Sequence, residues 1–497
     1  MKIVFACLSG FFAAVSSLYY VWILQLNSYR YSRAAKDMIF SLHSGLSFLF
    51  SALQIVLLFC AKNIITYYSF CVNLLLCGWL LLPKKTPIKF TKRVWRWAVV
   101  ILATCVLSFL FLNSYVVCLA QILVVIVADI ILLPLNGAIN CYYVKKAQKK
   151  LKQTNGVVVA VVGSMGKTSV KNILKAFLST KFKTECSPSS FNTPLGIAKF
   201  INSTDFSTRV LIVEAGAKKR GDIAKICRLF KPRHAVITGI AEQHLSTFKS
   251  IDNIIKAKGE VLDCLSDGGV CVINADNEYC KSYFNKGVAQ KLSVGNTGKD
   301  CRIKNVLNSP NGTQADLIFN GKTYHIFTPL LGEISAFNVA LSFCMAVKLG
   351  CNPDLLVQEA AKLDFVPHRL QLLRVGKRFV IDDSYNANTV GLKCLLDVVK
   401  GFNGNKLIVA QGIVEQGKKS KQVNRLAGVD MAKIADAVAV TGKNKRVLAE
   451  GLADGGLPQN KIFVCETVKD AVNKLAPFLT DGSVIAFQND LPDKING

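Results

Sequence analysis

Long apolar runs dominate the first 143 residues of the chain. Five of them are long enough, or nearly so, to cross a bilayer core of about 30 Å, and they lie near residues 3–25, 38–60, 64–83, 97–112 and 115–135. Lysine and arginine gather after the first, third and fifth runs, as the positive-inside rule requires of five spans with an outside N-terminus. The pattern predicts an α-helical transmembrane domain of about five helices over residues 1–143. The fourth run is the shortest, so a four-span or re-entrant arrangement stays open.

Two features of these runs bear on function. The first run is too long for the core of a signal peptide and lacks a small-x-small cleavage site, so we interpret it as a retained anchor. Asp129 lies inside the fifth run, and an acid within a span is a candidate functional residue. The alternative is a carboxylate that is paired or protonated inside the helix bundle.

After residue 144 the pattern changes to short apolar runs that alternate with helical stretches. Strands are predicted at 157–162, 210–213, 235–240 and 270–274. Two alternating stretches between 313 and 328 flank Asn320-Gly321, which is typical of a β-hairpin, and a helix is predicted over 336–349. This alternation predicts an α/β domain over residues 144–366, with a mainly parallel sheet and ligands at the carboxyl ends of its strands.

A second alternating series begins near residue 367. Its predicted strands are 379–381, 407–410, 437–440, 462–465 and 484–487, with helical stretches between them. The series predicts a separate Rossmann-like domain over residues 367–497.

Composition narrows the class of protein. With 51% hydrophobic residues the chain is not disordered, and its 17 cysteines include no Cys-x-x-Cys pair, which argues against a disulfide scaffold. The 61 Lys and Arg outnumber the 32 Asp and Glu, which gives a formal charge of +29. No nucleic-acid-binding motif occurs, so we interpret the surplus as suited to an anionic membrane surface or a phosphorylated substrate.

The strongest local signal is a glycine loop that follows a predicted strand and opens a predicted helix. Its residues are Gly163, Ser164, Met165, Gly166, Lys167, Thr168 and Ser169. Backbone N–H groups of such a loop bind phosphate, the lysine neutralises β- and γ-phosphate charge, and the threonine hydroxyl can bind Mg²⁺. Val161 replaces the first glycine of the usual pattern, so this is the shorter Gly-x-x-Gly-Lys-Thr form. A chance glycine turn is the alternative.

Glu214 ends the second predicted strand and faces the same sheet edge as the loop. A carboxylate at that place can hold Mg²⁺, although a solvated strand-end glutamate is also common. His244, in the loop after the third strand, and the stretch 256–260 carry little weight on their own.

Taken together, eight motifs in order resemble the Mur ligase family. They are the glycine loop, Glu214 with Gly216 and Ala217, His244, the 256–260 stretch Lys-Ala-Lys-Gly-Glu, Asn274-Ala275-Asp276, Gly332 with Asn338, Pro367-His368-Arg369-Leu370, and 382–388 (Asp-Asp-Ser-Tyr-Asn-Ala-Asn). The resemblance covers about residues 150–497. It is most similar to the members that join D-alanyl-D-alanine to a UDP-muramoyl tripeptide.

The resemblance implies an ATP-dependent carboxylate–amine ligase that works through an acyl phosphate in peptidoglycan synthesis. ATP and Mg²⁺ are the implied cofactors, and the UDP-muramoyl tripeptide and D-alanyl-D-alanine are the implied substrates. Other cell-wall synthesis proteins are candidate partners, and nucleic acid is not. With the apolar runs, the implied location is a bacterial inner membrane with cytoplasmic catalytic domains.

The resemblance also implies roles for particular residues. Lys167, His244 and Lys258 would be catalytic, and Thr168, Glu214, His244 and a carbamylated Lys258 would hold metal. Besides the loop, the nucleotide would be bound by Asn274, Asn338, Arg369 and Asp383. Substrate would be bound by Asn192, Thr193, Asn386 and Asn388.

Several alternatives stay open. Members of the family usually begin with a domain that holds the UDP-sugar, whereas apolar runs stand in that place here, so a lipid-linked acceptor is one alternative. A ligase of the polyglutamate type shares the ATP chemistry. A P-loop transport motor and a catalytically inactive membrane scaffold belong to other classes.

Overall fold

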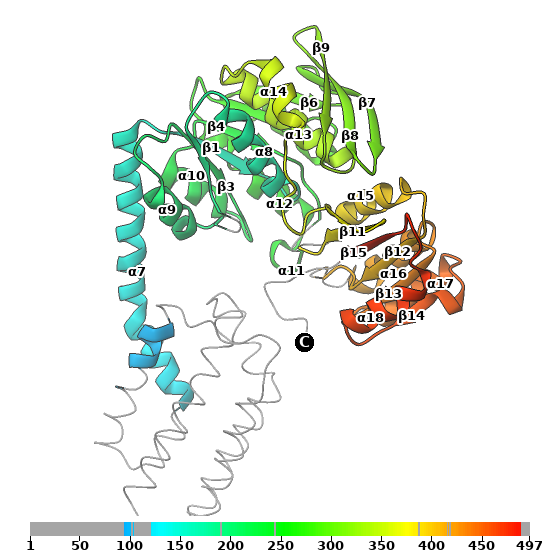
Figure 1. Ribbon diagram of the computed structural model, residues 1–497. Coiled ribbons are helices and arrows are strands. Elements are labelled where there is room, and N and C mark those ends of the chain that lie inside the picture. The colour runs from blue at the N-terminus through cyan, green and yellow to red at the C-terminus, as the bar shows by residue number, and fades with distance from the viewer. Residues whose placement is uncertain are drawn as a thin grey trace, which may run out of the picture. The chain divides into compact units, whose positions relative to one another are not determined.

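The computed structural model describes residues 94–100, 103, 121–188, 191–242, 245–385, 388–414, 416 and 419–488. Contacts between residues divide the chain into one compact unit of residues 1–141 with 492–497 and a second of residues 142–491. The second unit contains two β-sheets (Figure 1).

The structure does not support the predicted transmembrane domain over residues 1–143. Among the residues described, no helix is both long and apolar enough to cross a membrane. The predicted spans 3–25, 38–60 and 64–83 lie outside the described residues, as does most of 97–112. The last predicted span, 115–135, is described only from residue 121, and Pro134 lies within it. The predicted location in a bacterial inner membrane is therefore wrong.

Helix α7 (Gln121–Thr154) begins within this last apolar run and ends in a lysine-rich segment. Asp129 lies on α7, but its side chain is outside what the structure describes. In the second unit, Ala147 of α7 is buried in the protein core, and Gln148 donates a hydrogen bond to the carbonyl of Leu229 at 2.9 Å. The predicted boundary at 143/144 thus falls within a continuous helix.

The first sheet has nine strands in the order β2-β3-β1-β4-β5-β6-β7-β8-β9. The strands are β1 (Val157–Val162), β2 (Thr184–Cys186), β3 (Val210–Glu214), β4 (His234–Ile237), β5 (Val270–Asn274), β6 (Gln290–Gly295), β7 (Cys301–Ser309), β8 (Gly312–Phe319) and β9 (Lys322–Thr328). Pairing is parallel from β2 to β7 and antiparallel from β7 to β9. The predicted hairpin is confirmed, with positive φ at both Asn320 and Gly321.

Helices connect and cover these strands. They are α8 (Lys167–Ser179), α9 (Pro194–Ser203), α10 (Asp222–Phe230), α11 (Leu245–Phe248), α12 (Ile251–Gly259), α13 (Glu333–Lys348), α14 (Pro353–Ala360) and the 3₁₀ turns η1 (Leu262–Cys264) and η2 (Glu278–Asn285). Helix α13 begins three residues before its predicted start, because Gly332 at φ 86° precedes its first turn.

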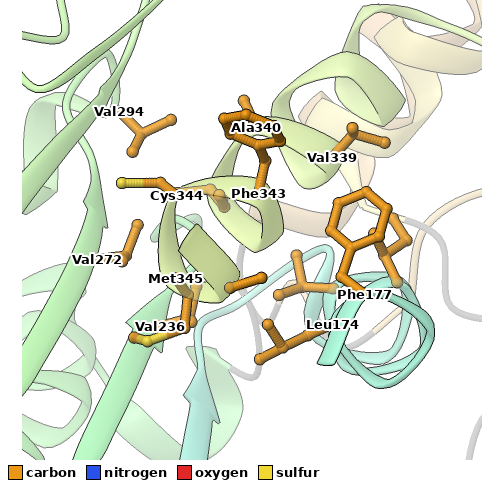
Figure 2. Packing of buried hydrophobic residues seen from close by; sticks show 14 of the residues in the cluster. Leu174, Phe177, Val236, Val272, Val294, Val339, Ala340, Phe343, Cys344 and Met345 are labelled. Atoms are coloured by element: carbon orange, nitrogen blue, oxygen red, sulfur yellow. The ribbon is translucent and has the colours of Figure 1, made fainter. Parts of the chain in front are cut away.

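Alternate side chains of the parallel strands enter two separate cores, because successive residues of a strand point to opposite faces. Val159, Val161 and Val236 pack on one face and Ala160 and Ile237 on the other. On the first face, α13 side chains fill the space between the strands and α8. Figure 2 shows this packing, with Val236, Val272 and Val294 from the strands, Leu174 and Phe177 from α8, and Val339, Ala340, Phe343, Cys344 and Met345 from α13.

Helix α13 is buried along its length, from Ser335 to Ala346. A helix that is apolar all round has no solvent face and must lie inside the protein. Burial of a side chain such as Phe343 contributes about 1.5–3 kcal/mol to stability. This rigid helix reaches the glycine loop at its N-terminal end, where Asn338 lies.

The second sheet has six strands in the order β10-β11-β15-β12-β13-β14, and only β10 is antiparallel. The strands are β10 (Gln371–Val375), β11 (Arg378–Asp383), β12 (Lys406–Ala410), β13 (Ala437–Val440), β14 (Ile462–Val464) and β15 (Val484–Gln488). The helices are α15 (Thr389–Lys400), α16 (Ser420–Ala432), α17 (Lys445–Asp454) and α18 (Val468–Leu475), with 3₁₀ turns η4 (Gln459–Lys461) and η5 (Ala476–Phe478). The prediction of two α/β sheet regions is confirmed.

Candidate active site

The glycine loop connects β1 to α8, as its sequence predicts. Gly163 adopts φ 157°, and a Cβ there would lie 2.0 Å from the hydroxyl of Thr238. Gly166 adopts φ 71° and precedes the first turn of α8. The Ser164 amide donates to the carbonyl of Gly239 at 2.8 Å, and its hydroxyl to the carbonyl of Ala241 at 3.1 Å. The loop is therefore held from the segment after β4, and its two glycines cannot be replaced freely.

Lys167 is folded back over the loop. Its ammonium donates to the carbonyl of Ser164 at 3.2 Å. Burial lowers the pKa of Lys167, Arg369 and Lys171 lower it further, and Glu214 raises it. The lysine thus lies in a field that holds more positive than negative groups, which suits a polyphosphate anion.

Glu214 meets the loop as predicted. The Thr168 hydroxyl donates to Glu214 Oε2 at 2.9 Å, and the backbone N–H of Glu214 donates to the hydroxyl of Ser187 at 3.2 Å. Strand β3 pairs directly with β1, so its last residue lies beside the start of α8. Glu214 is buried at this place, with its side chain 6% exposed.

Sequence reasoning missed Lys171. Its ammonium lies 3.5 Å from Glu214 Oε2, and the residue is 1% exposed. The signal was present, because Lys171 follows Lys167 by four residues and residues at that spacing share a helix face.

Lys258 is buried on α12, whereas Lys256, two residues earlier, is exposed. Burial lowers the pKa of Lys258 to about 7, the charge of Lys167 lowers it too, and Glu214 and Asp222 raise it. Lys167, Glu214 and Lys258 are thus close enough to influence one another's charge. His244 lies outside the described residues, so its predicted place beside Lys258 stays a prediction.

Asn338 lies directly against the loop. A Cβ on Gly166 would come within 2.7 Å of Asn338 Oδ1, and Asn338 is 4% exposed. Asn274 is engaged differently: its Nδ2 donates to the carbonyl of Thr238 at 3.1 Å, and its Oδ1 accepts from the N–H of Asp276 at 3.0 Å. These bonds give Asn274 a part in shaping the turn beside the loop.

Arg369 and Asp383 lie together near the start of the second sheet. The backbone N–H of Leu370 donates to Asp383 Oδ1 at 3.3 Å, and the Arg369 guanidinium lies 4.3 Å from the ring centroid of Tyr385. Burial raises the pKa of Asp383 to about 6, and Arg369 opposes this shift. A cavity of about 500 Å³ is lined by Ser169 of the loop, by Arg369 and by other residues of α8 and the segment 359–370.

Two residues predicted to bind substrate cap helices. Thr193 Oγ1 accepts from the N–H of Gly196 at 3.3 Å at the start of α9, and Asn388 Oδ1 accepts from the N–H of Gly391 at 2.8 Å at the start of α15. Asn192 lies beside the segment that follows Glu214, because its carbonyl accepts from the N–H of Gly216 at 3.1 Å. Asn386 lies outside the described residues.

The oxygen donors present suit a hard cation that shares its coordination with phosphate. Mg²⁺ is commonly held by one or two carboxylates together with phosphate oxygens and water. Thr168 and Glu214 supply a hydroxyl and a carboxylate at the loop. No group of three or more His, Cys, Asp or Glu that could hold a metal by itself occurs in the described part of the chain.

Comparison with known proteins agrees with this architecture. Residues 161–346 match the Mur ligase middle domain, and residues 368–488 match the Mur ligase, glutamate ligase domain. The first match contains the glycine loop and Glu214, and the second contains the six-stranded sheet. The chain belongs to the Mur ligase family, whose members use ATP.

Curated relatives include the UDP-N-acetylmuramoyl-tripeptide–D-alanyl-D-alanine ligases of Buchnera aphidicola and Escherichia coli. The first is 28% identical over 279 residues, which cover 56% of this chain and 61% of the relative. The second is 27% identical over 304 residues, which cover 60% of this chain and 67% of the relative. The chain therefore spans about two thirds or less of the length of these two relatives.

Solved structures agree with the fold. The MurF ligase of Thermotoga maritima in complex with ADP is 25% identical with a TM-score of 0.63, and the match covers 71% of this chain and 80% of that one. MurF of Acinetobacter baumannii is 22% identical with a TM-score of 0.65 over 71% and 77% of the two chains, which shows a shared fold.

Proposed function

We propose that the protein is an ATP-dependent ligase that joins D-alanyl-D-alanine to a UDP-N-acetylmuramoyl tripeptide in peptidoglycan precursor synthesis. The observation that carries the proposal is the cluster of Thr168, Glu214, Lys167 and the buried Lys258 beside a phosphate-binding loop. The named relatives support the choice of substrates, since ligases of that activity match 56% and 60% of this chain.

The loop and its neighbours would bind the nucleotide. Backbone N–H groups of residues 163–169 and the N-terminus of α8 are suited to the β- and γ-phosphates. Lys167 would lie along the phosphates, and Asn338, buried against the loop, would contact the base. Arg369, which precedes β10, and Asp383, the last residue of β11, would complete the nucleotide site, with Asn274 shaping the turn beside the loop.

Thr168 and Glu214 would hold Mg²⁺ that arrives with ATP, and His244 with a carbamylated Lys258 would hold a second ion. Bound Mg²⁺ neutralises phosphate oxygens and so lets an anionic carboxylate approach them. A lysine whose pKa is about 7 is largely neutral at slightly alkaline pH, and only the neutral amine attacks CO₂. The amine nitrogen forms a bond to the carbon of CO₂ and releases one proton, which leaves an anionic oxygen ligand.

The reaction would proceed in two displacements. The substrate carboxylate attacks the γ-phosphorus, ADP leaves, and an acyl phosphate forms. The amine of the dipeptide then attacks the acyl carbon, phosphate leaves, and one proton is lost from nitrogen. The main obstacle is the first step, because two anions meet, and Lys167 and Arg369 lower this barrier as fixed cations.

The assay supplies purified protein with ATP, Mg²⁺, UDP-muramoyl tripeptide and D-alanyl-D-alanine, and measures phosphate release. We expect release that depends on both substrates. Release that ignores the dipeptide contradicts the proposal, and release with glutamate or with a lipid-linked acceptor instead assigns the chain to one of those related activities. The absence of release under all of these conditions favours a catalytically inactive protein.

A matched pair of variants tests the role of Lys258. Lys258→Ala removes the buried amine, so we expect a loss of turnover of at least 100-fold, whereas Lys256→Ala alters only an exposed lysine on the same helix and should keep near-normal turnover. Removal of bicarbonate should slow the native protein and leave Lys258→Ala unchanged. Normal turnover by Lys258→Ala contradicts the carbamate.

A further inference from the structure

Glu214 poses an electrostatic problem before any nucleotide arrives. Its side chain is 6% exposed, and an ionised carboxylate removed from water is strongly unfavourable unless a cation and hydrogen bonds accompany it. A metal that arrives only with the nucleotide cannot supply that charge in the free protein. A resident cation must do so.

Lys171 has the geometry of that cation. It lies one helical turn after Lys167 on α8, and its side chain is 1% exposed with the ammonium 3.5 Å from Glu214 Oε2. The Thr168 hydroxyl donates to the same oxygen at 2.9 Å. Thr168 and Lys171, which are three residues apart on α8, therefore both contact Oε2 of Glu214. Oε1 takes part in neither contact.

We propose that Lys171 is a positioning residue that holds the Glu214 carboxylate toward the phosphate loop in the free protein, so that Oε1 is already presented when Mg²⁺ arrives with the nucleotide. The inference rests on the proposed function only in that the loop binds a nucleotide with Mg²⁺. It assigns Lys171 to the metal through Glu214 and not to the phosphate.

This assignment predicts a selective defect. Without Lys171 the carboxylate loses its fixed orientation, and loss of a group that orients a metal ligand typically weakens metal affinity 10- to 100-fold. A lysine that contacts phosphate directly would instead weaken nucleotide binding whether or not metal is present.

The experiment compares Lys171→Met with the native protein by calorimetric titration with ADP, once with Mg²⁺ and once with EDTA. We expect Lys171→Met to weaken ADP binding about 10- to 100-fold with Mg²⁺ and less than about threefold in EDTA. Lys183→Met is the control, because Lys183 forms an exposed ion pair with Asp205 at 2.7 Å, and it should change neither affinity. Equal weakening in both buffers, or tighter binding with Mg²⁺, overturns the inference.

A double-variant cycle keeps the inference testable if Lys171→Met folds poorly. Glu214→Gln removes the charge that Lys171 balances, so Lys171→Met/Glu214→Gln should unfold at a higher temperature than Lys171→Met. It should also bind Mg²⁺–ADP no more weakly than Glu214→Gln alone, because Lys171 acts through Glu214. Additive losses overturn the inference. A native protein that binds no Mg²⁺–ADP overturns the proposed function as well, whereas normal Mg²⁺–ADP binding by Lys171→Met overturns only this inference.

Discussion

Gly166 of the glycine loop packs closely against the buried Asn338. Replacement of Gly166 by alanine tests whether Asn338 confines the loop. Gly166 adopts φ 71°, a left-handed conformation that costs a residue with a Cβ about 1–2 kcal/mol. The new Cβ would also lie 2.7 Å from Asn338 Oδ1, closer than real Cβ contacts come. Asn338 is 4% exposed, so it must leave its preferred rotamer at a further cost of about 0.5–1.5 kcal/mol.

The matched control is Gly268→Ala. Gly268 adopts a similar φ of 78°, but a Cβ there meets nothing within 4 Å, so this variant carries the conformational cost alone. We expect Gly166→Ala to lower the free energy of unfolding by about 1.5–3.5 kcal/mol and Gly268→Ala by about 1–2 kcal/mol. Urea denaturation measures both values. The variant Gly166→Ala/Asn338→Ala, in which the clash is absent, shows how much of the difference is steric.

The same change should act on function. A displaced loop and Asn338 should weaken ADP binding at least tenfold, which corresponds to about 1.4 kcal/mol, whereas Gly268→Ala should bind ADP normally. Calorimetric titration with ADP measures this difference. If Gly166→Ala matches Gly268→Ala in both stability and ADP affinity, Asn338 does not confine the loop and the reasoning is refuted.

Three further predictions concern Asp383, Asn424 and Cys264. Burial raises the pKa of Asp383 to about 6, so the stabilising effect of its bound proton is fully present below about pH 4 and is lost as the pH rises through 6. In urea denaturation, Asp383→Asn should therefore be more stable than the native protein by about 1–3 kcal/mol at pH 7.5 and equally stable near pH 4. An Asp383→Asn variant that gains no stability at pH 7.5 contradicts this sign. Asn424 is fully buried and exchanges hydrogen bonds of 2.8 and 2.9 Å with the backbone of Ile413. Asn424→Ala should therefore lower the free energy of unfolding, measured by urea denaturation, by about 2–4 kcal/mol. A loss below about 1 kcal/mol contradicts this prediction. A hydrogen bond from Cys227 lowers the pKa of Cys264 to about 7, so iodoacetamide at pH 7.5 should label Cys264 first among the described cysteines. Mass spectrometry can measure the rate of labelling, which Cys227→Ala should lower. An unchanged rate in Cys227→Ala argues against the hydrogen bond.

Much of the local structure was predictable. Strands β1, β5 and β13 have the same bounds as their predicted counterparts, because each is a continuous apolar run of a strand buried on both faces. Strand β10 was not predicted, since its residues are half-buried or exposed and only its antiparallel partner β11 orders them. The predicted membrane location is not supported, because no helix in the described part of the chain is long and apolar enough to cross a membrane. Apolar length in a sequence does not by itself establish a span.

The candidate site divides in the same way. The glycine loop was recognisable because its residues are contiguous and because a strand before it and a helix after it are local features. Thr193 and Asn388 are predicted substrate ligands, and the structure adds that they cap α9 and α15, a role that polar residues before helices often have. Their contact with substrate stays a prediction.

The sequence by itself therefore determined the phosphate loop, the strand ends that carry Glu214 and the order of the two α/β regions, since these depend on short-range pattern. The tertiary structure alone decided that Thr168 and Lys171 share one oxygen of Glu214, because β1 and β3 become neighbours only when the sheet forms. It also decided that Lys258 is buried, which lowers the pKa of this lysine. Such a shift arises from removal of an ammonium group from water beside other cations, and burial of that kind is a property of the packed fold.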